Sequence, residues 1–239
     1  MAAPTPEISV VVPMHDERGT LDELVERVRF TLDGAGMSWE LVIVDDASTD
    51  GSGERLDELA GADSRVVGLH FASRYGQTSG LDAGFRHARG ELIAILDADL
   101  QTFPEDLPEL VDRLRRDGAD AVVGIRAERH DSGWKRFSSA FANGVRNRLT
   151  REDIQDTGCP LKVFRGDAVR SLKLFDGMHR FLPTLLRMEG FTVVQVPVRH
   201  AARGYGRTKY GTWDRAFRGL RDALAVRWMQ DRHLRWKLR

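Results

Sequence analysis

Pairs of carboxylates follow three apolar runs of this 239-residue chain, each at the point where the run ends. The pairs are Asp16 and Glu17, Asp45 and Asp46, and Asp97 and Asp99. Carboxylates that gather at one place repel one another unless a cation or the donors of a ligand bind them. Mg²⁺ and Mn²⁺ prefer such oxygen ligands and commonly bridge to substrate phosphates. The pattern therefore predicts a divalent-cation site for a phosphate-bearing ligand, whereas an isolated Asp-x-Asp would more often cap a turn.

The elements that must position these carboxylates are strands that alternate with helices. Strands are predicted for five apolar runs: Ile8 to Met14, Glu40 to Asp46, Val66 to Phe71, Glu91 to Asp97 and Asp120 to Arg126. Helical patterns separate most of them, and the capping-box signature from Thr20 to Glu23 predicts a helix through about Asp33. This alternation predicts an α/β fold whose central sheet is mostly parallel and covered by helices on both faces. Parallel strands end at one edge, so the carboxylate pairs are expected to converge where such sheets bind ligands.

The second half of the chain ends in a basic segment. Helices are predicted near Trp134 to Thr150 and His179 to Glu189, followed by a strand from Thr192 to Val198. From Arg199 to Arg239 there are 12 Lys or Arg against 3 Asp or Glu, although the whole chain has no net charge. This asymmetry predicts that the C-terminal end seeks anions.

Residues 211–239 are predicted to form a basic amphipathic helix. Its apolar stripe recurs every three or four residues and consists of Trp213, Phe217, Leu220, Leu224 and Trp228. Arg215, Arg218, Arg221 and Arg227 fall largely off the stripe. Such a helix can lie in a bilayer interface, where the expected partner is the membrane surface or a membrane-embedded subunit. In the alternative interpretation the stripe docks on the chain's own core or on a partner subunit.

Composition and motifs exclude several classes of protein. A composition with 41% hydrophobic and 30% charged residues is typical of a globular domain, and no apolar run is long enough to span a membrane. The N-terminus has no basic and apolar signal segment, so a cytosolic location is expected. Cys159 is the single cysteine, which excludes an intrachain disulfide and a cysteine-based zinc site. The glycine patterns of dinucleotide-binding and P-loop proteins are absent, and no nucleic acid partner is expected.

The order and spacing of seven motifs resemble those of family 2 glycosyltransferases with the GT-A fold. The motifs are VVPMHDE, VDDAST, RYGQTSGLDAGFRHARGE, LDADLQTFPEDLP, VVGIR, DTGCPLKVFR and VPVRHAARGYGRTKYG. They look most like the branch that transfers sugars to polyprenyl phosphate, which includes dolichol-phosphate mannosyltransferases and undecaprenyl-phosphate aminoarabinose and glucose transferases. The resemblance implies a catalytic domain over 1–210, with a nucleotide-sugar half at about 1–100, an acceptor half at about 101–210, and the helical tail beyond.

The resemblance also implies a role for individual residues. Nucleotide-binding residues would be Pro13, His15, Glu17, Asp45, Asp46 and Asp97. Asp97, Asp99 and Gln101 would hold Mg²⁺ or Mn²⁺ with the sugar diphosphate. The acceptor phosphate would meet Arg126, Arg136, Arg203, Arg207 and Lys209. Catalytic positions would be Asp97, Asp99 and Asp156. Gln77 is expected to begin the helix beside this pocket, and His179 and His200 are expected to be structural.

The implied reaction inverts the anomeric centre of a UDP- or GDP-sugar on transfer to undecaprenyl or dolichyl phosphate at the inner face of the membrane. A phosphate acceptor is largely dianionic and needs no general base. If the acceptor were a glycan or protein hydroxyl, Asp156 would be the candidate base. A third possibility is a non-catalytic subunit that binds a nucleotide sugar. His15 and Asp16 stand where many relatives have Tyr-Asn, so the choice between UDP and GDP stays open.

Overall fold

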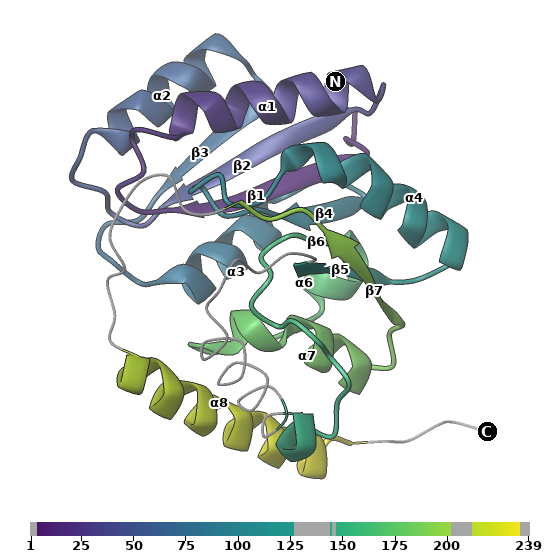
Figure 1. The fold of residues 1–239 in the computed structure, drawn as a ribbon. Coiled ribbons are helices and arrows are strands. Elements are labelled where there is room, and N and C mark those ends of the chain that lie inside the picture. Colours follow the sequence, from purple (N-terminus) through teal and green to yellow (C-terminus); the bar gives the residue numbers. More distant parts are fainter. Residues whose placement is uncertain (1–3, 127–143, 145–146, 202–211, 235–239) are drawn as a thin grey trace.

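A single sheet forms the centre of the computed structural model, which describes residues 4–126, 144, 147–201 and 212–234. In this part of the chain the sheet has seven strands in the order β3-β2-β1-β4-β6-β5-β7 (Figure 1). The strands are β1 Ile8–Met14, β2 Trp39–Asp45, β3 Val66–His70, β4 Leu92–Ile95, β5 Ala121–Arg126, β6 Lys162–Arg165 and β7 Val193–Val198. Strand β6 is antiparallel to both of its neighbours, β4 and β5, and the other pairings are parallel. The predicted α/β fold with a mostly parallel sheet is therefore confirmed.

Helices cover both faces of the sheet. They are α1 Leu21–Gly34, α2 Ser52–Ala62, α3 Gln77–His87, η1 Pro104–Asp106, α4 Leu107–Asp117, α6 Gly166–Arg170, η2 Met178–Phe181, α7 Leu182–Met188 and α8 Thr212–Arg232. Figure 1 shows α1, α2 and α4 on one face and α3, α6 and α7 on the other, with α8 outside this second layer. Successive residues of β1 alternate between two cores, because Val10 and Val12 pack under α1 and α4 whereas Val11 packs against α3.

Helix α1 begins at Leu21, directly after Thr20, where the sequence placed its start. The predicted capping box is wrong, because the Thr20 side chain makes no hydrogen bond to the first turn of the helix. Its hydroxyl instead donates to the carbonyl oxygen of Ala98 at 2.7 Å. Thr20 thereby joins the start of α1 to the loop that follows β4, which contains two of the predicted site carboxylates.

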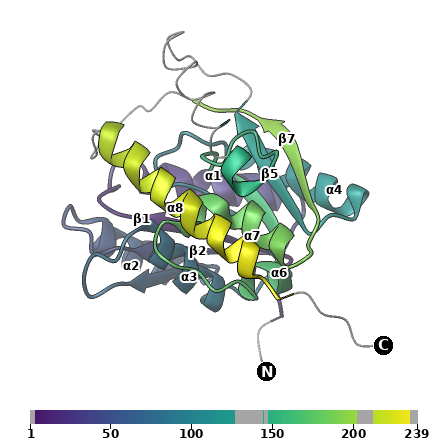
Figure 2. The same ribbon diagram turned by 90° about the horizontal axis from the view of Figure 1, so that it is seen from below.

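Helix α8 has two apolar faces. Ala223 and Val226 are buried in the core beside α7, and Figure 2 shows the helix crossing the outer side of α7. Leu220, Leu224 and Trp228, which belong to the predicted stripe, are 45%, 52% and 64% exposed. This part of the stripe therefore does not dock on the chain's own core. Among the described residues, no helix combines the length and hydropathy that crossing a bilayer requires.

Candidate functional site

The loops that follow β1, β2 and β4 meet at the carboxyl edge of the sheet. These three strands are neighbours, and they run parallel to one another. Each loop contains one non-glycine residue with a left-handed backbone: Asp16 at φ 55°, Ala47 at φ 56° and Leu100 at φ 57°. Such strained residues are uncommon and cluster at functional sites. The three loops therefore reach the same edge of the sheet, as predicted.

Asp45 and Asp46, at the end of β2, are both about 5% exposed and accept hydrogen bonds from the protein. Asp45 accepts the backbone N–H of Ser48 at 3.0 Å. Asp46 accepts the backbone N–H groups of Tyr75 and Gly76 at 2.6 and 2.9 Å. The Asp46 carboxylate therefore fixes the turn from which α3 begins.

The nucleotide-binding residues predicted in β1 and its loop lie at the same edge. Pro13 packs closely on Gly80 of α3, where an added Cβ would lie 3.1 Å from the Pro13 Cβ. The Nδ1 of His15 is 2.9 Å from the carbonyl oxygen of Asp46. The backbone N–H of Glu17 donates to the Ser52 hydroxyl at 3.1 Å. These contacts hold the β1 and β2 loops together, while their roles in nucleotide binding stay predictions.

The predicted metal ligands occupy the loop after β4, and all three are partly buried. Asp97 Oδ1 accepts the side-chain amide of Gln77 at 3.1 Å, and Asp99 Oδ1 accepts the backbone N–H of Gln101 at 3.2 Å. Gln101 also exchanges hydrogen bonds with Ala201, which ties this loop to the start of the basic C-terminal segment. Gln77 is the first residue of α3, as predicted.

The donor set of this loop fits a hard divalent cation. Two carboxylates and an amide oxygen are the ligands that Mg²⁺ and Mn²⁺ take in proteins. The residues that the structure describes contain no group of three or more His, Cys, Asp or Glu side chains able to hold a metal ion. A bound ion would therefore complete its shell with water and phosphate oxygens, which is common for Mg²⁺.

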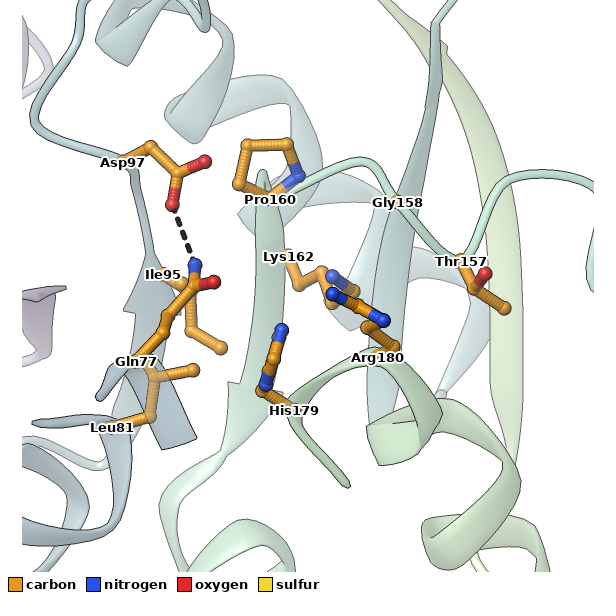
Figure 3. Close-up of a pocket in the computed structure, with 10 residues that line it drawn as sticks. All are labelled: Gln77, Leu81, Ile95, Asp97, Thr157, Gly158, Pro160, Lys162, His179 and Arg180. Carbon is orange, nitrogen blue, oxygen red and sulfur yellow. Dashed lines mark hydrogen bonds between the residues drawn. The ribbon is translucent and has the colours of Figure 1, made fainter. Parts of the chain in front are cut away.

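A cavity of about 140 Å³ opens beside Asp97. Its lining consists of Gln77, Leu81, Ile95, Asp97, Thr157, Gly158, Pro160, Lys162, His179 and Arg180. Figure 3 shows Gln77 and Asp97 on one side, with Lys162, His179 and Arg180 facing them. A single buried water needs roughly 10–15 Å³ by a comparable measure, so this space suits a larger group. The cavity brings together two segments that are distant in the sequence, 77–97 and 157–180.

Lys162 is the residue of this cavity that sequence reasoning missed most clearly. It begins β6, is 4% exposed, and donates from Nζ to the carbonyl oxygen of Cys159. Burial lowers the pKa of its ammonium group from the ordinary value. The signal in the sequence was a lysine inside the apolar run PLKVF, because lysine is rarely buried without a partner. Arg180 was missed as well.

His179 is held at the cavity wall by Thr78. The Thr78 hydroxyl oxygen accepts the backbone N–H of Gly177 at 3.1 Å and lies 2.7 Å from His179 Nδ1. Burial, and then the nearby charges of Arg180 and Lys162, lower the pKa of His179 to about 3. The ring is therefore neutral near pH 7. The expected structural contact is present, but His179 also faces the cavity.

Asp156 and Arg126 form an ion pair at the end of β5. Arg126 Nε is 2.6 Å from Oδ2 of Asp156, and Nη2 is 2.8 Å from Oδ1. The backbone N–H of Gly158 also donates to Oδ1, at 3.1 Å. The predicted base and the predicted phosphate-binding cation are thus partners, and both roles stay predictions. Arg136, Arg203, Arg207 and Lys209 lie outside the described residues.

Comparison with families and curated proteins gives consistent matches. The model of "Glycosyl transferase family 2" matches residues 9–173. The undecaprenyl-phosphate 4-deoxy-4-formamido-L-arabinose transferase of Edwardsiella ictaluri is 38% identical over 205 residues, which cover 85% of this chain and 63% of that protein. The Shewanella sediminis protein of the same name is 36% identical, with 85% of this chain and 62% of that protein covered. The chain thus spans less than two thirds of these relatives.

Two solved structures have the same fold. The mannosyltransferase PcManGT of Pyrobaculum calidifontis, in complex with GDP-Man and Mn²⁺, has a TM-score of 0.62 at 21% identity over 94% of this chain and 70% of that chain. The glucosyl-3-phosphoglycerate synthase of Mycobacterium tuberculosis, in complex with Mn²⁺, UDP and phosphoglyceric acid, has a TM-score of 0.70 at 19% identity over 94% and 78%. The predicted GT-A fold is confirmed by this similarity.

Proposed function

Because the chain belongs to glycosyl transferase family 2, we propose that it transfers a sugar from a nucleoside diphosphate sugar to a polyprenyl phosphate. The observation that carries the proposal is the similarity to undecaprenyl-phosphate sugar transferases over 85% of the chain. The loop after β4 also supplies Asp97 to the cavity, which supports binding of the donor substrate at this edge of the sheet.

The donor nucleotide would lie across the ends of β1 and β2. Pro13, His15 and Glu17 would line its binding site together with Asp45, Asp46 and Asp97. The hydrogen bonds that Asp46 accepts from the turn at 75–76 support this assignment, because they fix the wall of the site before a ligand arrives. Such preorganisation reduces the free-energy cost of binding.

Asp97, Asp99 and Gln101 would hold Mg²⁺ or Mn²⁺. When bound, the ion would neutralise the negative charge that develops on the departing diphosphate. The task of the chain itself is to orient these ligands. Gln77 does this for Asp97, since its amide donates to Oδ1 at 3.1 Å.

The acceptor phosphate would attack the anomeric carbon from the side opposite to the diphosphate. One of its oxygens forms the new bond to carbon while the bond from carbon to the diphosphate oxygen breaks, which inverts the centre. The phosphate is largely dianionic near neutral pH, so no proton has to be removed. A hydroxyl acceptor would require Asp156 as a base. The ion pair between Asp156 and Arg126 supports a phosphate acceptor instead, because the carboxylate is already bound by the guanidinium. Arg136, Arg203, Arg207 and Lys209 are the proposed phosphate-binding cations.

The outer face of α8 would bring the enzyme to the inner face of the membrane. Leu220, Leu224 and Trp228 point outwards at a spacing of four residues, and Arg221 beside them is exposed. An amphipathic helix with this composition binds the interface through its apolar face, and its basic residues attract anionic lipids. A peripheral enzyme would reach a lipid-bound phosphate in this way.

The decisive experiment follows label from nucleotide sugar into lipid. The purified protein is incubated with Mn²⁺, undecaprenyl phosphate in detergent, and a panel of labelled UDP- and GDP-sugars, and the organic phase is counted. We expect label to enter the organic phase with one donor. Transfer to a soluble glycan or peptide, with undecaprenyl phosphate ignored, would support a hydroxyl acceptor instead. Metal-dependent nucleotide binding without any transfer would support a non-catalytic subunit.

A further inference from the structure

The wall of the cavity opposite Asp97 is formed by hydrogen-bond donors. Lys162 and Arg180 are cations, and His179 is a neutral ring beside them (Figure 3). Asp97 is the sole carboxylate among the ten lining residues, and its Oδ1 already accepts the Gln77 amide. Donors therefore outnumber acceptors on the surface that a ligand would meet.

The buried ammonium group of Lys162 is only partly satisfied by the protein. It has three N–H bonds, and the residues that the structure describes take one of them, at the carbonyl oxygen of Cys159. A buried donor without an acceptor costs stability, and a buried charge without a counter-charge costs more. An anion in the cavity would remove this cost and favour the charged form of the amine.

Arg180 adds a second cation to the same wall. Within the described part of the chain, its guanidinium makes no hydrogen bond or ion pair. Figure 3 shows its side chain extending from η2 into the cavity, beside Lys162. A guanidinium binds a carboxylate through two parallel hydrogen bonds. The neutral His179 ring supplies a further donor if Nδ1 accepts the Thr78 proton, because its own proton is then on Nε2.

The position of the cavity indicates which part of the donor substrate would enter it. In the proposed function, on which this inference rests, the diphosphate lies at Asp97 and Asp99. The group attached to the diphosphate is the sugar, and the space immediately beyond Asp97 is this cavity. The cations stand on its far side, at the start of β6 and on η2, where they would meet a substituent of the sugar.

We propose that the cavity lined by Lys162, His179 and Arg180 binds the sugar of the nucleotide donor, and that this sugar carries a carboxylate. The preferred donor is thus a nucleotide-activated uronic acid. A neutral hexose would leave the unused N–H groups of Lys162 and Arg180 without an anionic partner on the ligand, whereas one carboxylate pairs with both.

The test compares nucleotide sugars that differ only in the carboxylate of the sugar. Binding of UDP-glucuronate and UDP-glucose, and of UDP-galacturonate and UDP-galactose, is measured by calorimetry with Mn²⁺ present. GDP-mannuronate and GDP-mannose replace them if the protein binds GDP and not UDP. A hydrogen bond to a charged group contributes roughly 1.5–3 kcal/mol, so we expect at least one uronate to bind about tenfold or more tightly than its neutral partner.

Two variants assign the preference to the cavity. Arg180→Gln should reduce it to less than about threefold, in line with the loss of a charge-assisted pair. Lys162→Met, of similar length, should act in the same direction, and Arg180→Gln keeps the test valid if that buried substitution unfolds the protein. Arg86→Gln removes the same charge from an exposed position on α3 and should leave the preference intact.

Four outcomes decide the proposal. A tenfold preference that Arg180→Gln reduces, alone or together with Lys162→Met, supports it. Equal binding within every matched pair overturns it, as does a preference that survives both variants. If inorganic phosphate binds the wild type and is lost in Arg180→Gln while the sugar preference is unchanged, the cations serve the acceptor phosphate instead. Failure of UDP and GDP alike to bind would count against the proposed function itself.

Discussion

The carboxylate of Asp156 and the guanidinium of Arg126 form a two-point ion pair, with distances of 2.6 and 2.8 Å between their nitrogen and oxygen atoms. The two side chains are only 8% and 18% exposed. The pair joins the end of β5 to the loop that leads into β6. It therefore holds one wall of the cavity in place.

Removal of the Asp156 charge is expected to destabilise the fold. Asp156→Asn removes the negative charge that the Arg126 guanidinium contacts at two points, and breaking a buried pair of this kind costs about 3–5 kcal/mol. The free energy of unfolding in urea measures this loss. Asp153→Asn is the control, because its carboxylate is 77% exposed in its pair with Arg187 and should contribute much less. Unchanged stability together with abolished transfer would indicate a catalytic base.

Loss of Asp99 is expected to remove metal-dependent transfer and leave the fold intact. A divalent ion contributes several kcal/mol to charge stabilisation, so Asp99→Ala should lower the transfer rate by roughly 100-fold or more. Nucleotide affinity should also lose its dependence on Mn²⁺, which calorimetry measures independently of turnover. Asp112→Ala, at an exposed position on α4, should behave as the wild type. Near-normal transfer by Asp99→Ala would refute the metal role.

His179 should make stability depend on pH. Its pKa falls from the ordinary 6.5 in the unfolded chain to about 3 in the folded one. Between these values only the unfolded chain binds the proton, so stability is full above about pH 6.5 and is lost as the pH falls towards 3. From pH 7.5 to 5.5 the wild type should lose about 1.4 kcal/mol more than His179→Gln does.

Urea unfolding at the two pH values measures this difference between the proteins. His87→Gln, at an exposed position on α3, is the matched control and should follow the wild type at both. If His179→Gln lost as much stability as the wild type, the ring would not be held neutral by its surroundings.

The outer face of α8 should carry membrane binding without stabilising the fold. Leu224 and Trp228 are 52% and 64% exposed, so their replacement by serine should change the free energy of unfolding by less than about 0.5 kcal/mol. Flotation with vesicles that contain phosphatidylglycerol should fall sharply. If the variant with serine at both positions floats as well as the wild type, this face of α8 does not bind the membrane.

A matched substitution on the inner face separates the two roles of α8. Val226 is fully buried, so Val226→Ser should destabilise the protein by about 2–4 kcal/mol. Deletion of 211–239 is a poorer test of membrane binding, because it also removes Val226 and Ala223 from the core beside α7.

The positions in the fold that the sequence predicted correctly depend on local rules. A parallel strand brings its end to a known edge, which is why Asp45, Asp97 and Asp99 could be located from their place after apolar runs. Gln77 at the start of α3 follows from the glycine before it, which adopts φ 88°. These features need no knowledge of distant contacts.

The parts that sequence reasoning missed depend on distant contacts. Asp156 lies 30 residues from Arg126, and no local pattern indicates which of the many arginines it pairs with. The exposed stripe of α8 could be predicted from its large apolar residues. The second, buried face of the helix includes small residues such as Ala223, which contribute little to the pattern of hydrophobic residues along the sequence. Lys162 was missed because the apolar composition of β6 does not indicate that this strand runs antiparallel to its neighbours.

The antiparallel direction of β6 places the two sides of the cavity on different segments of the chain. Lys162 pairs with Ile95 across the antiparallel β4 and β6, so the start of one strand lies beside the end of the other. The side chains that would meet nucleotide and metal come from the ends of β1, β2 and β4, whereas the cations come from the segments around β6 and η2. Substitutions in these later segments can change which sugar is accepted while leaving the first hundred residues as they are. In the proposed function, leaving-group chemistry and sugar choice would thus lie on different stretches of the chain.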